Sequence, residues 1–380
     1  MILCALTLTL LLAAASWAKA AGDEERSSSI KWSAEIGFEH TDNLFHLSQS
    51  QEAALEEIEE ENVENHRFDD MESMSDTIFS PEIGFRYKTD SPMGGKFSIG
   101  SKVAYNFHMD NKERNYPEAK ITMEHSVGKK GVLSLENDLL FDFFKKNYLS
   151  AADDDNGNGN VPRDERTYSA AFYDEYESIL SYEHELLKNK GQMLSEVDIR
   201  PFIGYGSRTY NSLFENRDRN IAIGGIGLVF EFMSRLDLEV IYTYESVSGA
   251  NGNELVLFDE TVKDTDVNDD GDIKSNAALV TRIDRSSNRY TIEISPSLEL
   301  SKDIQLFAEY KKRTTDYQSD NPLDIDHYET TAYREKIGGG IQYDFMKSWS
   351  AEAKYEKTDE DDEDDDYTEN VFSVSVKYAF

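Results

Sequence analysis

The chain is short of cysteine, of positive charge and of long hydrophobic runs, and each shortage excludes a class of protein. Its single cysteine, Cys4, lies in the leading apolar run, so a chain that loses this run has no disulfide or thiolate site. Lys and Arg number 39 against 75 Asp and Glu, and the net charge of −36 excludes non-specific attraction to nucleic-acid phosphates. No later segment has the run of about eighteen apolar residues that a transmembrane helix needs.

The first twenty residues read as a secretion signal. The apolar run from Ile2 to Ala15 has the length of a signal-peptide core and is too short to span a bilayer. Ala18-Lys19-Ala20 provides a small-x-small cleavage site, so the mature chain is expected to begin at Ala21. We therefore predict a signal peptide over 1–20 and one domain over 21–380.

Apolar residues recur at every second position along much of the mature chain, which is the period of a β-strand with one face in an apolar environment. Each such segment has the length of a tilted membrane-crossing strand. Bulges or displaced strand boundaries are expected at Pro81, Pro117, Pro201 and Pro296, because each removes a ladder donor, and bends are expected at Gly224-Gly225 and Gly338–Gly340. The segments are 29–40, 76–89, 95–108, 116–127, 131–145, 165–183, 192–208, 219–233, 236–247, 287–301, 303–312, 328–346, 348–357 and 369–380.

The connections between these segments alternate in length, which is typical of an up-and-down barrel with tight turns at one end and loops at the other. The fold class is therefore all-β: a transmembrane antiparallel up-and-down barrel of about 14 strands, within roughly 12 to 16. We expect short periplasmic turns, both termini on the periplasmic side, long acidic extracellular loops, and closure by pairing of 29–40 with 369–380. The long loops are expected near 41–75, 109–115, 146–164, 209–218, 248–286, 313–327 and 358–368.

The final strand carries apolar residues at alternate positions and finishes on Tyr378 and Phe380. With a secretion signal, this resembles the C-terminal signature of Gram-negative outer-membrane β-barrels, and the resemblance implies that Phe380 and Tyr378 are read by the barrel assembly machinery. The segment Phe38-Glu39-His40-Thr41-Asp42-Asn43-Leu44-Phe45 resembles BBP2-type β-barrel porins, some of which are associated with exopolysaccharide export. The chain has no evident periplasmic helical-repeat domain, unlike two-part barrels that secrete polymers.

The alternate positions of the strands are mainly polar or charged, whereas Trp32, Ile36 and Phe38 of the first strand are expected to face lipid. A charge at the lipid midplane costs about 2–4 kcal/mol, so the charged faces must line a hydrated interior. Acids outnumber bases there, which favours cations and neutral solutes. Alternatively, the charges form ion-paired ladders that brace a barrel conducting nothing. The pore-lining candidates are Glu35, Glu82, Arg86, Lys102, Glu136, Asp198, Arg200, Glu239, Glu293, Glu309, Lys336 and Glu352.

One loop carries oxygen ligands at alternate positions followed by Gly271, which is similar to the first half of an EF-hand calcium loop. A calcium ion is expected on Asp266, Asn268, Asp270 and Asp272, although the twelfth position is Ala277, and an acidic turn without a metal is the alternative. No other cofactor is required. No Ser/His/Asp set occurs in a recognisable local motif, so we expect no enzyme activity.

Three functions fit these observations. The first is a porin-like outer-membrane channel for small polar or cationic solutes, or the exit pore of an export system. The second is a non-conducting structural or adhesive barrel with cation-binding acidic loops. The third is the sleeve of a porin–cytochrome electron conduit, whose haem must come from a partner because the chain has no Cys-x-x-Cys-His motif. The expected partners are outer-membrane lipid, lipopolysaccharide and the assembly machinery, with no nucleic acid; monomer and trimer both fit.

Overall fold

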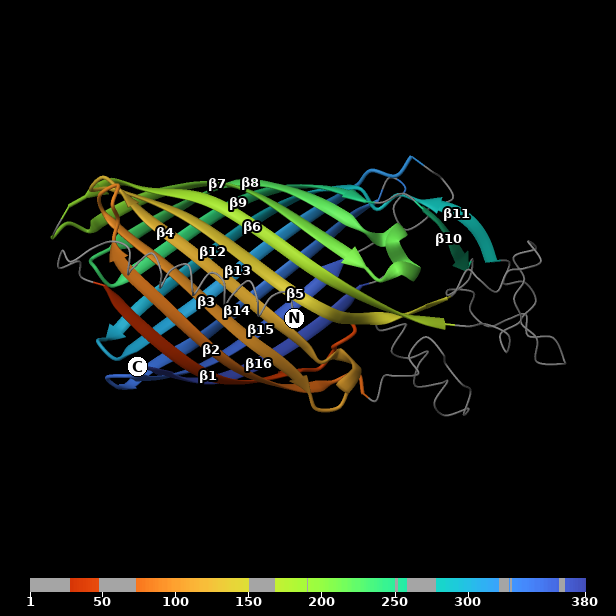
Figure 1. The fold of residues 1–380 in the computed structure, drawn as a ribbon, viewed down its shortest axis with the longest axis horizontal. Helices are drawn as coiled ribbons and strands as arrows, with labels where there is room; N and C mark the ends of the chain where they lie inside the picture. The colour runs from red at the N-terminus through yellow and green to blue at the C-terminus, as the bar shows by residue number, and fades with distance from the viewer. Residues whose placement is uncertain are drawn as a thin grey trace.

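The computed structural model is a closed antiparallel β-barrel of fourteen strands (Figure 1). It describes residues 28–47, 73–149, 168–189, 191–249, 252–257, 278–320, 328, 330–361 and 366–380. The predicted signal peptide and the calcium-loop residues 264–273 lie outside these ranges. The fold class predicted from the sequence is confirmed, including its number of strands.

The strands follow one another along the chain and each pairs with the next, apart from two junctions. They are β1 (Ser29–Thr41), β2 (Asp76–Asp90), β3 (Lys96–His108), β4 (Tyr116–Val127), β5 (Gly131–Leu149), β6 (Tyr168–Lys188), β7 (Leu194–Tyr210), β8 (Arg219–Phe232), β9 (Leu236–Gly249), β10 (Gly252–Leu257), β11 (Ala278–Ile283), β12 (Ser287–Ser301), β13 (Ile304–Tyr317), β14 (Thr331–Met346), β15 (Trp349–Asp361) and β16 (Tyr367–Ala379). Two 3-10 helices, η1 (Lys112–Arg114) and η4 (Ser212–Arg217), follow β3 and β7.

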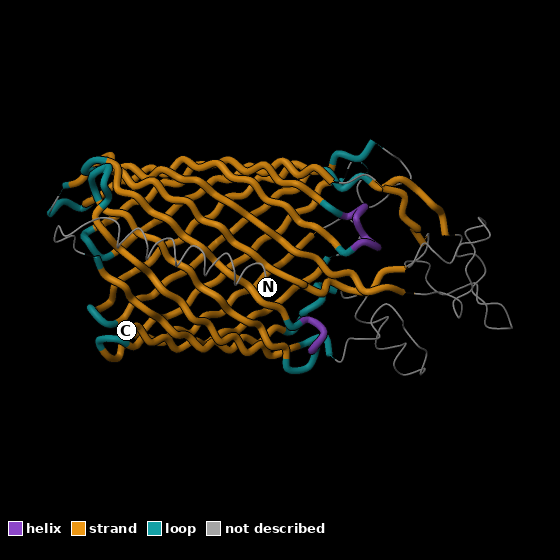
Figure 2. The backbone as a smooth tube through the Cα atoms, in the orientation of Figure 1, coloured by secondary structure: helices purple, strands orange, loops and turns teal. Residues whose placement is uncertain are grey.

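The two junctions are β9 with β12 and β1 with β16. Among the strands that the structure describes, the hairpin β10–β11 between β9 and β12 pairs only with itself and is a separate two-stranded sheet. Figure 2 shows the tilted strands as a cylinder, with the tight turns at one end and the two 3-10 helices at the other. We call these the turn end and the loop end.

Closure occurs where the sequence predicted it. β1 pairs antiparallel with β16 from Ser33↔Ala379 to Thr41↔Val371. At the turn end, the backbone N–H groups of Trp32 and Phe380 donate to each other's carbonyl oxygens at 2.8 and 2.9 Å. Closure satisfies the edge groups of both strands, which a bilayer would otherwise leave unpaired.

The boundaries of four expected loops need correction. β5 continues to Leu149, β13 to Tyr317 and β15 to Asp361, while the 248–286 loop contains the hairpin β10–β11. Apolar alternation marks the lipid-facing part of a strand, but backbone groups continue to pair beyond it because pairing satisfies their hydrogen bonds. The strands therefore extend further than their apolar pattern.

The bulges expected at Pro81 and Pro296 are absent from the described ladders, whereas the bends expected at the glycines stay a prediction. Pro81 and Pro296 each leave a gap in one ladder, and the register is the same on both sides of the gap. β8 keeps one register with β9 through Gly224-Gly225. The register shifts lie elsewhere, for example between Leu140 and Phe143 of β5.

The outer surface of the barrel is apolar and carries two aromatic belts. Large apolar side chains such as Ile203, 65% exposed, and Ile337, 59% exposed, point outward. The ring contacts of the turn-end belt include Trp32–Phe85 and Trp349–Tyr378, and those of the loop-end belt include Phe38–Phe79, Phe79–Phe107 and Tyr244–Tyr290. Aromatic belts mark the two membrane interfaces of a transmembrane β-barrel, and this is the architecture of the chain. No helix in the described ranges has the length and apolar character needed to cross a membrane.

Candidate functional site in the barrel lumen

The inner face of the wall is a network of ion pairs. Ten of the twelve pore-lining candidates take part in it, and among the described residues Asp198 and Glu352 have no ion pair. The pairs are Glu35–Lys377 at 3.2 Å, Glu82–Lys102 at 2.9 Å, Glu293–Lys311 at 3.4 Å, Glu309–Lys354 at 3.3 Å, and the closer contacts Arg86–Glu124, Lys120–Glu136, Arg200–Glu239 and Lys336–Glu356. Their pore-lining role stays a prediction, which conductance tests.

Three of these ion pairs pass over a whole strand. Arg200 of β7 reaches Glu239 of β9 across Gly227 of β8, and a Cβ added to Gly227 would lie 3.4 Å from the Arg200 Nε. Arg86 of β2 reaches Glu124 of β4 across β3. On β3, Gly100 is the register partner of Arg86, and Ser98 is the register partner of Glu124. The Lys354–Glu309 pair crosses β14 in the same way at Gly338 and Gly340. Small inward residues therefore let these charged side chains lie flat against the wall.

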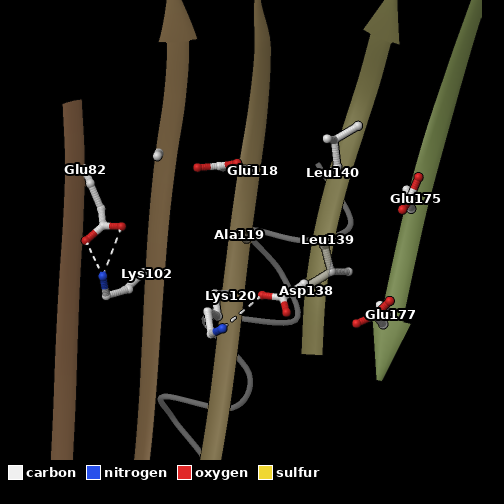
Figure 3. Close-up of a pocket in the computed structure, with 11 residues that line it drawn as sticks. Glu82, Lys102, Glu118, Ala119, Lys120, Asp138, Leu139, Leu140, Glu175 and Glu177 are labelled. Carbon is white, nitrogen blue, oxygen red and sulfur yellow. Dashed lines mark hydrogen bonds and ion pairs between the residues drawn. The ribbon is translucent and has the colours of Figure 1, made fainter. Parts of the chain in front are cut away.

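In the described part of the chain, two cavities lie against the inner face of the barrel wall. The larger, about 680 Å³, is lined by residues from Thr122 of β4 round to Lys311 of β13. The smaller, about 420 Å³, lies against β2 to β6. Figure 3 shows the Glu82–Lys102 and Asp138–Lys120 contacts in this cavity, together with Glu118, Glu175 and Glu177. Among the described residues, Glu118 and Glu177 have no ion pair, so this part of the lumen carries surplus negative charge.

At the loop end, the segment after β1 folds against the mouth. Asn43 is buried; its side chain donates to the carbonyls of Leu47 and Thr368 and accepts from the Leu47 N–H. Asp42 accepts hydrogen bonds from both the backbone and the side chain of Asn370. The Asp-Asn-Leu-Phe step that suggested a family resemblance therefore fastens the first loop to the last strand.

The loop between β3 and β4 is held by one buried carboxylate. Asp76 is fully buried and accepts the backbone N–H groups of Met109, Asp110 and Asn111, each at 3.1 Å. Its carboxylate also accepts from the Asn111 side chain and contacts His108 Nδ1. A single side chain thus satisfies the donors of a whole turn, as buried polar groups require.

This loop carries Arg114 into the mouth. Its guanidinium donates to the Leu44 carbonyl at 2.9 Å and lies 4.9 Å from the centre of the Phe45 ring and 5.0 Å from that of Phe143. Burial lowers the pKa of Arg114 from its ordinary value. Arg114 connects the first loop to β5 and covers one side of the loop-end mouth.

Inward aromatic side chains continue from Arg114 along the wall. Tyr116 contacts Phe143 at 4.9 Å between ring centroids, Phe143 contacts Tyr173 at 5.1 Å, and Tyr173 contacts Tyr210 at 5.3 Å. Phe214 of η4 packs against the same cluster. The loop-end lumen therefore has one aromatic wall, which the sequence analysis did not identify.

Beside this wall, five strands each present an arginine near the loop end. Sequence analysis also missed this set, although one arginine near the same end of several strands was a visible signal. We call it the arginine arc: Arg208, Arg219, Arg289, Arg313 and Arg334, on β7, β8, β12, β13 and β14.

Comparison with known proteins gives structural likenesses alone. No family model matches the chain, and no curated protein matches it. Among solved structures, a bacterial polysaccharide outer membrane secretin is 8% identical with a TM-score of 0.45 over 91% of this chain and 98% of that one. The channel DcaP of Acinetobacter baumannii is 9% identical (TM-score 0.42; 94% and 99%), and OmpT of Vibrio cholerae is 7% identical (TM-score 0.41; 94% and 99%). At these values the likenesses carry no argument, and the barrel is established by its own strand pairing.

Proposed function

We propose that the protein is an outer-membrane channel that passes small polar solutes, with its turn end in the periplasm and its acidic loops outside. The observation that carries the proposal is the charged inner face, because its side chains lie along the wall and leave internal cavities of about 680 and 420 Å³. Charged groups inside a membrane barrel need water around them. A hydrated lumen that crosses the membrane is a route for polar solutes.

The acidic surplus around Glu118 and Glu177 supports a preference for cations, because fixed charges of one sign concentrate mobile ions of the other. Outside the membrane, the acidic loops are proposed to contact divalent cations at the lipopolysaccharide surface. Calcium in the 264–273 loop and the absence of enzyme activity remain predictions; calorimetry with calcium tests the first.

Planar-bilayer recording of the purified mature barrel tests the channel. We expect stepwise single-channel conductance, and a reversal potential in a KCl gradient that shows K⁺ to be more permeant than Cl⁻. Heat-unfolded protein is the control and should give no steps. An anion-selective reversal potential would remove the cation preference while leaving the channel.

The ion pairs that cross an intervening strand favour a second candidate, a braced barrel that conducts nothing. Silence in a barrel whose folding is shown by its shifted mobility on an unheated gel would support this structural or adhesive role and overturn the channel. If the barrel is instead the exit pore for an exported polymer, large neutral polymers should enter the pore and block its conductance.

A further inference from the structure

The arginine arc has more positive charge than its neighbours balance. In the register, Arg208 lies directly opposite Arg219, and Arg313 lies directly opposite Arg334. Arg289 lies between these two pairs, and its positive charge repels those of Arg219 and Arg313. Like charges directly opposite each other destabilise a sheet, so the arrangement has a cost that needs a compensating group.

Carboxylates of the wall compensate three of the five arginines. Arg208 pairs with Glu175, Arg289 with Glu245 at 3.5 Å, and Arg334 with Glu360 at 3.7 Å. Arg219 and Arg313 have no carboxylate within 4 Å among the described residues. Their Nε atoms are shielded from solvent and donate no hydrogen bond to any residue that the structure describes. Two half-enclosed positive charges without a described carboxylate partner are costly, and a bound anion would balance them.

The surroundings suit an anion. Arg208 lies 4.2 Å above the centre of the Tyr173 ring, so the arc begins against the aromatic wall. That wall excludes water on one side, which strengthens charge interactions. Below the arc, the cavity of about 680 Å³ is lined by Glu245, Lys311 and Glu293 of the same part of the wall and gives a solute room to approach.

We propose that the arginine arc is a binding site for the oxyanion of a solute, a carboxylate or a phosphate, held chiefly by Arg219 and Arg313. Guanidinium groups bind such oxyanions through paired hydrogen bonds, which gives arginine its specificity for them. The inference deepens the proposed function by giving the channel an anion-binding step at its loop end, within a lumen that otherwise favours cations.

Calorimetry of the mature barrel in detergent tests the site without requiring conductance. Sodium glucuronate presents a carboxylate, glucose 6-phosphate presents a phosphate, and glucose presents neither. We expect heat from one or both anions and none from glucose. The arms distinguish a carboxylate site from a phosphate site, and absence of binding by both anions overturns the proposal.

The deciding variant is Arg219→Gln combined with Arg313→Gln. Loss of two charge-assisted contacts should weaken anion binding by about tenfold or more. Arg235→Gln is the matched control, because it removes the same charge from an exposed arginine in the turn between β8 and β9 and should leave binding unchanged. Equal anion affinity in the double variant and the parent overturns the proposal.

Should the double variant fail to fold, Arg219→Lys with Arg313→Lys keeps both charges while removing the forked donors. This variant should bind the anions more weakly than the parent, and unchanged affinity would contradict the proposed recognition.

In bilayers, glucuronate on the loop-end side should reduce current through the parent channel and not through the Gln variant. A silent barrel that still binds the anions refutes the channel and leaves the arc standing. A conducting barrel that binds neither anion refutes the arc and leaves the channel standing.

Discussion

Some glycines of the barrel wall leave room that a neighbouring side chain fills. A Cβ added to Gly225 would lie 2.2 Å from Cζ of Phe202 and 2.4 Å from the backbone oxygen of Tyr242, whereas one added to Gly224 would have nothing within 4 Å. The two neighbours point to opposite faces of the same strand, as successive strand residues must. Gly225 therefore makes room for the inward ring of Phe202, whereas Gly224 faces open space.

This contrast gives a single-residue prediction. Gly225→Ala should destabilise the barrel by about 1–3 kcal/mol, the usual range for overpacking, because the Tyr242 backbone cannot move without disturbing the β8–β9 ladder. Gly224→Ala is the matched control and should be close to neutral. The measurement is the temperature at which each barrel loses its folded mobility on a gel; equal temperatures would show that Phe202 and the strand adjust freely.

A second single-residue prediction concerns Asp76. Asp76→Ala should remove the acceptor of the Asp110 and Asn111 backbone N–H groups and loosen the turn that carries Arg114, because buried unmade hydrogen bonds are costly. Trypsin should then cut after Lys112 or Arg114 at least about tenfold faster, since one lost charged acceptor weakens such a turn by roughly that factor. Mass spectrometry of the fragments measures this.

The matched control is Asp110→Ala, which removes a carboxylate from the same turn where the side chain is exposed. Rapid cleavage of this control as well would show that the turn opens whichever carboxylate is lost, and would refute the special role of Asp76.

Among whole elements, the hairpin β10–β11 stands apart from the wall. β9 pairs directly with β12 from Leu236↔Leu298 to Val247↔Ser287, so the barrel ladder is continuous without the hairpin. Within the described part of the chain, its two strands form ladders only with each other. It is therefore an addition to one loop and not a part of the barrel.

Deletion of residues 252–283, with a short Gly-Ser linker in their place, should leave the barrel folded. Loop length changes the closure entropy only slowly, so the unfolding temperature of the barrel should change by no more than a few degrees. Gel mobility after heating measures it. A deletion variant that never acquires the folded mobility would show that the hairpin contributes to barrel formation.

The sequence predicts strands well wherever every second side chain faces lipid. β1, β4 and β12 lie within a residue of the segments read from alternation, because lipid imposes a regular apolar pattern. The hairpin β10–β11 was missed because strands outside the membrane have no such constraint. The arginine arc was missed because its members are spread from Arg208 to Arg334 in sequence and meet only after the barrel closes.

For the whole molecule, the first property to test is closure itself. Gly37 and Ser375 are register partners across the β1–β16 junction, and the mature chain is predicted to have no cysteine of its own. Partners in adjacent strands have Cα separations of about 4.5–5.5 Å, within the range that a disulfide spans. Gly37→Cys with Ser375→Cys should therefore cross-link on oxidation.

The matched control places the second cysteine at Ser350 of β15, which pairs with Lys377 of β16 and is therefore two strands away from β1. Two strand spacings make about 9–10 Å, too far for a disulfide. Non-reducing gels of both double variants measure the result. Cross-linking of both pairs, or of neither, would contradict the register.

The register that closes the barrel also gathers the arginine arc. A barrel that sealed two residues out of step at the β9–β12 junction would keep every side chain on its own face. Its wall would remain watertight, but Arg208 and Arg219 would be displaced by about 7 Å along the strands from the other three arginines. If the barrel is the proposed channel, faulty assembly would thus leave a pore of similar width that binds the anion less well, and solute selectivity would report correct assembly more sensitively than conductance.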